Sequence, residues 1–246
     1  MKKKHAFILA LVLTVIIAVN VLVISDINEP KRKQVTVKRV IDGDTFQTYN
    51  NETIRLANIN SPEKGSHGSE EAKDFLSKLE NSTIEIEIIK IEKYGRFLAR
   101  VYTADYLNLE IVEKGLAKKF LVEQNELTEF NEAEKQAIEN SRGMWTKSEY
   151  YGCFNTEINE KEETVKITNT CRIISIKDWT IEDESRKKYK FHDISLGEVN
   201  LHSQNGEDSE TDLFWSSSQN IWNNDRDTLY LFDKNEKIAH HETYGY

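Results

Sequence analysis

The sequence contains little cysteine and little proline, and it has no surplus of positive charge. Only two of its 246 residues are cysteines, Cys153 and Cys171, and their spacing matches no metal-binding signature, which excludes a cysteine-based metal site. The chain has only two prolines, and its overall composition is ordinary for a globular protein. Because the net charge is −9, the chain as a whole does not attract polyanions, so any binding of nucleic acid depends on local arginines and a bound cation.

The chain begins with a long apolar segment. Lysines at positions 2–4 precede residues 6–25, in which threonine, asparagine and serine are the polar side chains. A helix of about 20 such residues spans the hydrocarbon core of a bilayer. Residues 1–25 are therefore predicted to be a membrane anchor, with a cleaved signal peptide as the alternative. Either interpretation predicts extracellular domains on the cell membrane or a secreted protein, with residues 26–33 as a polar tether.

Residues 34–148 are predicted to form an α+β domain built on a small barrel. Apolar strand patterns flank Asn50 and Asn51, which tolerate the positive φ of a tight hairpin turn. Alternating isoleucine and glutamate in residues 84–88 indicate a half-buried strand, with residues 96–102 as its return partner. Five strands with inserted helices fit a Greek-key barrel. Helices are expected at residues 69–79, at 109–114 with Asn108 as the cap, and at 127–141.

Three polar blocks lie at turns or strand ends of this domain, at residues 42–45, 55–63 and 93–96. Together they supply carboxylates, a side-chain amide and two arginines. Hard divalent cations prefer oxygen ligands, and arginine forks bind phosphate oxygens in pairs. A carboxylate can also accept a proton from water. A single Asp-Gly-Asp is more often a solvated turn, but the three blocks together indicate cleavage of a phosphodiester with one metal ion.

In this order, the blocks resemble those of the thermonuclease (staphylococcal-nuclease-like) family. The resemblance covers roughly Val35 to Trp145 and includes residues 114–117 and 142–145. It implies an OB-fold barrel and a calcium-dependent nuclease that acts on DNA and RNA with little sequence preference and leaves 3′-phosphate ends. The resemblance assigns Asp44, Asn60 and Ser61 (through its main-chain carbonyl) to the metal, Arg55, Glu63 and Arg96 to catalysis with Glu63 as the base, and Lys93 and Tyr94 to the substrate.

Asn60 is a departure from the family pattern, which has an aspartate at this position. The amide keeps one oxygen ligand and removes one negative charge, and ligand charge tunes calcium affinity. Weaker calcium binding is therefore expected. The alternative interpretation is a catalytically weak or inactive barrel that holds single-stranded nucleic acid at a surface.

From residue 164 onward, short apolar runs alternate with turn residues at intervals of about 8–12 positions, which predicts an all-β sandwich. Residues 164–246 would form this domain, and residues 149–163 a polar linker crossed by few contacts. The blocks at residues 178–183, 189–191 and 221–224 resemble those of the lamin-tail domain, an immunoglobulin-like sandwich. No catalytic constellation is visible in this half, so it is expected to bind a partner that the sequence does not identify.

The two cysteines flank the start of this second domain. In an exported chain an even number of cysteines indicates a disulfide, here between Cys153 and Cys171. Such a bond closes a loop of roughly 18 residues and stabilises the fold by about 3 kcal/mol in the chain-entropy account. Two buried free thiols are the alternative.

Overall fold

The structure, a computed structural model, describes residues 31–246 apart from the side chain of Tyr94. The predicted anchor at residues 1–25 lies outside the described residues, as does most of the tether. Among the described residues, no helix is long and apolar enough to cross a membrane. Residues 34–246 belong to one unit, which contains both predicted domains.

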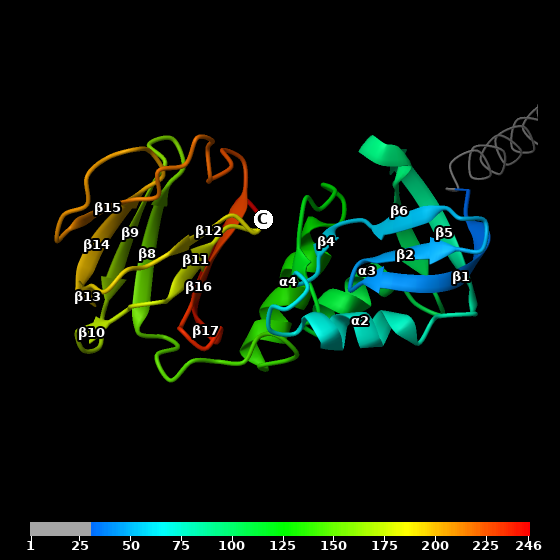
Figure 1. The fold of residues 1–246 in the computed structure, drawn as a ribbon, viewed down its shortest axis with the longest axis horizontal. Helices are drawn as coiled ribbons and strands as arrows, with labels where there is room; N and C mark the ends of the chain where they lie inside the picture. Colours follow the sequence, from blue (N-terminus) through cyan, green and yellow to red (C-terminus); the bar gives the residue numbers. More distant parts are fainter. Residues whose placement is uncertain (1–30) are drawn as a thin grey trace, which may run out of the picture. The chain divides into compact units, whose positions relative to one another are not determined.

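The first half of this unit is a closed barrel with the strand order β1-β2-β3-β6-β5 (Figure 1). Strands β3 and β6 pair in parallel, whereas β2 pairs antiparallel with both β1 and β3. This arrangement is the OB-fold barrel that the sequence predicts. The strands are β1 Lys33–Asp42, β2 Thr45–Thr48, β3 Thr53–Leu56, β5 Thr83–Ile91 and β6 Phe97–Tyr102.

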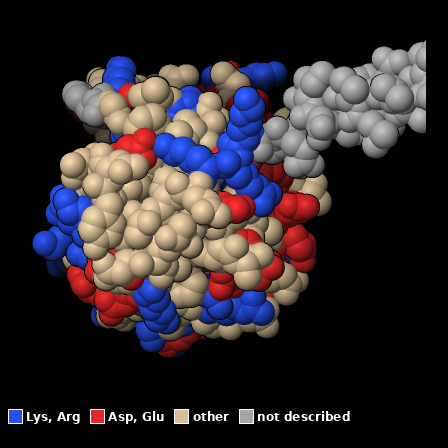
Figure 2. Space-filling model, turned by 90° about the vertical axis from the view of Figure 1, so that its right-hand side faces the viewer, with Lys and Arg blue, Asp and Glu red and all other residues tan. Residues whose placement is uncertain are grey.

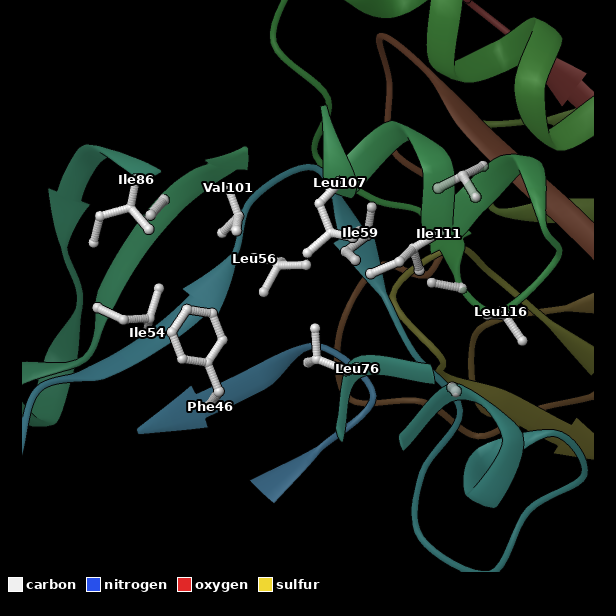
Figure 3. Close-up of a cluster of buried hydrophobic side chains, with 14 of the residues drawn as sticks. Phe46, Ile54, Leu56, Ile59, Leu76, Ile86, Val101, Leu107, Ile111 and Leu116 are labelled. Atoms are coloured by element: carbon white, nitrogen blue, oxygen red, sulfur yellow. The ribbon is translucent and has the colours of Figure 1, made fainter. Parts of the chain in front are cut away.

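Apolar side chains at alternate positions along the strands fill the interior of the barrel. In β1, Val35 and Val37 are buried and the residues between and beside them are more exposed. The turn between β2 and β3 contains Asn51 at φ 60°, the positive value that asparagine accepts. Figure 3 shows Phe46 and Ile54 pointing into the barrel together with other side chains that have no exposed surface. This close packing gives the barrel the rigidity that a site on its edge requires.

Three helices extend the barrel core: α2 Ser69–Ser77, α3 Leu107–Glu113 and α4 Leu127–Glu139. The expected cap Asn108 lies inside α3, and the N-cap is Tyr106. The buried amide of Asn108 accepts the N–H of Val101 at 2.9 Å and donates to the carbonyls of Ala57 and Ala99. The cap prediction was wrong because the amide makes three hydrogen bonds to backbone groups of the barrel, which is more than it would make as a helix cap.

The second half contains two four-stranded sheets, with strand orders β12-β11-β16-β17 and β15-β14-β9-β8. Apolar side chains from both sheets form one core cluster. A short pair, β10 with β13, lies outside the two sheets. The strands are β8 Phe154–Asn159, β9 Thr164–Asn169, β10 Ile174–Ser175, β11 Thr180–Glu182, β12 Lys188–Lys190, β13 Ser195–Leu196, β14 Glu198–His202, β15 Asp212–Phe214, β16 Asp227–Phe232 and β17 Ile238–Tyr244.

The predicted linker, residues 149–163, is partly wrong, because it contains strand β8. This strand pairs antiparallel with β9 along its whole length, from Phe154 opposite Asn169 to Asn159 opposite Thr164. Its sequence is mostly polar and gives a weak strand signal, but backbone hydrogen bonds to β9 and the buried Phe154 hold it in place. A disulfide joins Cys153 and Cys171 beside this ladder, with Cα atoms 5.3 Å apart, as predicted.

The expectation of few contacts between the halves is also wrong. A third core cluster contains Ala137, Ile138, Met144 and Trp145 from the first half and Tyr230, Phe232 and Ile238 from the second. Trp145 stacks on Tyr230 with ring centroids 5.3 Å apart. The short strands β4 Ile59–Asn60 and β7 Lys118–Lys119 pair with each other and lie beside this contact, since Lys118 Nζ reaches Glu182 of β11 at 2.6 Å.

Candidate active site

The site begins at the turn between β1 and β2. Gly43 is required there, because a Cβ atom would lie 2.6 Å from the Cβ of Ala72 and 2.8 Å from that of Ser61. The buried carboxylate of Asp44 accepts the N–H of Ser61 at 2.9 Å and the hydroxyl of Thr45 at 2.8 Å. The turn is therefore pressed against the segment that follows β4.

Asp42 supports the turn from its other side. Its carboxylate accepts the N–H of Asp44 at 3.1 Å. Burial, and then the neighbouring carboxylate of Asp44, raises the pKa of Asp42. Two carboxylates this close favour a cation between or beside them.

Arg55, in the centre of β3, holds the same segment. Its Nη1 donates to the carbonyls of Leu56 and Ile59 at 3.1 and 3.0 Å, and its Nη2 donates to the side-chain oxygen of Asn60. The guanidinium also lies 3.7 Å from the carboxylate of Asp44. The structure thus brings two of the predicted metal-binding residues, Asp44 and Asn60, to one buried arginine, and the third, Ser61, joins them through its N–H on Asp44.

The predicted metal ligands are of the chemical type that a hard cation prefers, but they carry little negative charge. They are a carboxylate, a side-chain amide oxygen and a main-chain carbonyl, all of them oxygen ligands of the kind that calcium takes. Only one of the three carries a negative charge. Within the part of the chain that the structure describes, no group of three or more His, Cys, Asp or Glu side chains could hold a metal ion. In chemical type the residues therefore fit a weakly bound calcium ion better than a tightly bound transition metal. Two of the three oxygens accept hydrogen bonds from guanidinium groups, Asn60 Oδ1 from Arg55 and the Ser61 carbonyl from Arg186, so calcium would share or displace those bonds.

Glu63 follows Pro62 and lies at the mouth of the site. Its side chain is 70% exposed, so water reaches the carboxylate. A groove of about 820 Å³ opens beside it. The first half lines this groove with residues that include Asn60, Ser61 and Glu63, and the second half with residues that include Lys188 and Lys190.

The predicted residues around Arg96 lie at the junction between β5 and β6. Lys93, Tyr94 and Gly95 form a short 3-10 helix between β5 and β6, and Nε of Arg96 donates to Glu92 at 2.7 Å. The parallel register places Arg55 opposite Leu98. Because residues two apart on an extended strand share a face, Arg96 lies on the side of the barrel wall that carries Arg55.

Sequence reasoning missed Arg186, which comes from the second half. Its Nη1 donates to the carbonyl of Ser61 at 2.7 Å, and its Nη2 pairs with Oε1 of Glu63 at 2.9 Å. Near it, the main-chain carbonyl of Glu184 accepts the side-chain N–H of Asn60 at 3.3 Å. Arg186 has a positive φ of 73°, but nothing in the sequence around it signals a contact with residues 61–63.

Positive and negative side chains are interspersed on one face of the molecule. Figure 2 shows this face, where Lys and Arg side chains lie in several places among Asp and Glu side chains, and uncharged residues cover the centre. Attraction of an anionic ligand therefore depends on the arginines of the site and on a cation, as the net charge of −9 suggests.

Comparison with known proteins identifies the class of protein to which the closed barrel belongs. Residues 53–147 match the family of staphylococcal nuclease homologues. An uncharacterized endonuclease of Escherichia coli O157:H7 is 30% identical over 120 residues, which are 46% of this chain and 77% of that protein. The endonuclease YncB of Bacillus subtilis strain 168 is 31% identical over 140 residues, or 50% of this chain and 66% of that protein.

The chain therefore belongs to the family of staphylococcal nuclease homologues, and it is a nuclease whose substrate is nucleic acid. The matched range contains the positions of Arg55, Glu63 and Arg96 and begins after Asp44. It ends before Arg186, so the contact between the second half and the site is not part of the matched region.

Proposed function

We propose that this chain is a calcium-dependent endonuclease that hydrolyses DNA and RNA with little sequence preference and leaves 3′-phosphate ends. The observation that carries the proposal is the cluster in which Arg55 contacts Asp44 and Asn60 while Asp44 accepts the N–H of Ser61, beside a groove that the exposed Glu63 lines. Calcium held by these oxygens would supply positive charge that stabilises the extra charge on the phosphoryl oxygens.

The side chains of the chain have separate roles in this proposal. Glu63 accepts a proton from water as the water oxygen bonds to phosphorus. The bond from phosphorus to the 5′ oxygen then breaks, and the leaving oxygen takes a proton from solvent. Arg55 and Arg96 stabilise the charge that develops on the phosphoryl group, and Lys93 and Tyr94 contact the substrate.

Cleavage of circular and linear DNA and of single-stranded RNA by the full chain tests this function. With millimolar calcium, circular DNA should be opened, and phosphatase treatment should make the new 3′ ends extendable by a polymerase. An excess of chelator should abolish cleavage. Glu63→Gln should lower kcat by about a hundredfold or more, as loss of a general base does. Full activity in chelator would refute the cation requirement, whereas binding without cleavage under all conditions would favour the inactive nucleic-acid-binding alternative.

We also propose that residues 1–25 direct the protein out of the cytoplasm. They either anchor the nuclease to the outer face of the cell membrane or are cleaved to release it as a secreted protein. The support is the apolar sequence after the N-terminal lysines, together with a weakly charged calcium site that suits millimolar calcium. Protease added to intact cells should digest the nuclease, and deletion of residues 1–25 should prevent its export. Protection from protease in intact cells would contradict this location.

For the second half we propose an immunoglobulin-like sandwich of the lamin-tail type that binds a partner. The support is the pair of four-stranded sheets that share one core, together with the sequence blocks that resemble that domain. An experimental structure of the full chain would test the strand order. A different connection between the two sheets would remove the lamin-tail assignment and leave the nuclease assignment intact.

A further inference from the structure

The loop between β11 and β12 lies against the residues that follow β4. Arg186, in this loop, contacts both the carbonyl of Ser61 and the carboxylate of Glu63. Pro62 stands between those two residues and has a fixed φ. The guanidinium therefore holds both ends of a short, stiff segment that includes the proposed base.

The loop itself is firmly built. The fully buried Asp183 accepts the N–H of Lys187 at 2.7 Å and the hydroxyl of Ser185 at 2.6 Å. Glu184 donates its N–H to Asp227 at 3.2 Å, and its carboxylate accepts the hydroxyl of Tyr246. These bonds fix the backbone on both sides of Arg186 before any substrate binds.

The backbone of Arg186 adopts an uncommon conformation. Its φ of 73° is in the left-handed region, which arginine rarely occupies. Such conformations persist where the surrounding structure enforces them, and they are concentrated at functional sites.

We propose that Arg186 is a positioning residue for Glu63, so that the second half of the chain completes the nuclease site. The inference rests on the proposed role of Glu63 as the base. An ion pair from Nη2 to Oε1 orients the carboxylate, while the side chain of Glu63 remains 70% exposed and that of Arg186 30% exposed. An inhibitory plug would instead cover the base, so this exposure favours a productive contact.

The orienting effect matters because Glu63 lies in a loop and not in a strand or helix. Proton transfer needs the carboxylate within hydrogen-bond reach of the attacking water, and small displacements of a catalytic group lower rates strongly. Arg186 supplies the fixed geometry that the loop lacks. Because other contacts join the halves, including Lys118 with Glu182, the loss of this pair should not separate them.

The test compares Arg186→Ala, Arg186→Lys and Lys187→Ala in the full chain, on a single-stranded oligonucleotide with saturating calcium. Lys187 is the matched control, because it lies in the same loop, carries the same charge, and its Nζ contacts Asp183 and the carbonyl of Asn220. Arg186→Ala should lower kcat by about a hundredfold with KM nearly unchanged. Arg186→Lys should retain part of the rate, and Lys187→Ala should stay within about twofold of the wild type.

Added guanidinium ion provides a readout that a merely structural role would not move. It should raise the rate of Arg186→Ala and leave that of Glu63→Gln unchanged. A wild-type or faster kcat in Arg186→Ala would overturn the inference while the proposed function stands, and a faster rate would identify Arg186 as inhibitory. Equal losses in Lys187→Ala would also overturn it. If Arg186→Ala does not fold, Arg186→Lys replaces it. A folded Arg186→Lys whose kcat equals that of the wild type, with and without guanidinium, would overturn the inference.

Absence of cleavage by the wild type would instead refute the proposed function itself.

Discussion

Lys119 and Glu134 form a fully buried ion pair where the two halves of the chain meet, with Nζ 2.5 Å from Oε2. Two residues of β16 complete the arrangement. Lys119 donates to the hydroxyl of Thr228 at 2.7 Å, and the hydroxyl of Tyr230 donates to Glu134 at 2.9 Å. The charges of the first half are therefore satisfied in part by the second half.

Lys119→Met should destabilise the full chain by about 3 kcal/mol or more, because it leaves the carboxylate of Glu134 buried without its cation. The double variant Lys119→Met with Glu134→Leu should lose less, since neither charge then remains. Urea unfolding measures both free energies. Lys114→Met is the control, because Lys114 pairs with Glu110 at 3.4 Å on the surface and should cost less than about 1 kcal/mol. Equal losses at the two lysines would contradict the role assigned to burial.

Asn60→Asp should tighten calcium binding. The change adds a negative charge to the proposed ligand set and places it against Arg55, although the contact with the carbonyl of Glu184 is lost. Calorimetric titration with calcium should show a dissociation constant lower by roughly tenfold, given how strongly ligand charge tunes calcium sites. Asn159→Asp adds the same charge in β8, away from the site, and should leave calcium binding unchanged. An unaltered constant in Asn60→Asp would mean that residue 60 does not contact the ion.

His240 should make the protein less stable in mild acid. Burial, and then the neighbouring His241, lowers the pKa of His240 from 6.5 to about 4. Below pH 6.5 the unfolded chain binds a proton on this ring and the folded chain does not, so the free energy of unfolding falls as the pH drops from 6.5 to 4. The stabilisation, about 3 kcal/mol, is fully present above that window.

Two buried carboxylates act in the opposite direction over part of the same window. Burial raises the pKa of Glu184 to about 7 and that of Asp227 to about 6, so their protonated forms favour the folded state as the pH falls. The measurement is therefore the difference between the wild type and His240→Gln in urea unfolding at pH 7, 5.5 and 4. The wild type should lose stability relative to the variant as the pH falls. Parallel curves would show that His240 is not the titrating group.

Loss of the disulfide should destabilise the second half. Cys171→Ser removes a bond that joins the start of β8 to the loop after β9, and the expected loss is about 3 kcal/mol. Reduction of the wild type should give the same loss, whereas reductant should not affect the variant. Thiol titration of the denatured, unreduced protein provides the direct check, because two free thiols there would contradict the bond.

Local sequence patterns predicted the strands and turns of the barrel. The alternation in residues 84–88 and the asparagines of the β2–β3 turn specify strands and a hairpin through nearest-neighbour geometry. The grouping of Asp44, Asn60 and Ser61 was predicted from the resemblance to the thermonuclease family, and in the structure Asp44 accepts the N–H of Ser61 while Gly43 permits the close approach. The presence of two cysteines in an exported chain likewise predicted the disulfide that the structure contains.

Only the tertiary structure decided where the second half contacts the first. The pairing of Arg186 with Glu63 joins residues far apart in the sequence, and it depends on how a rigid loop of one half meets an edge of the other. No local period encodes such a contact, because it depends on how the halves pack, through Trp145 against Tyr230 and through the hydrogen bonds that join Lys119 to Thr228 and Tyr230 to Glu134. The strand β8 escaped prediction for the same reason, since its polar residues are held by hydrogen bonds to β9 and not by their own propensity.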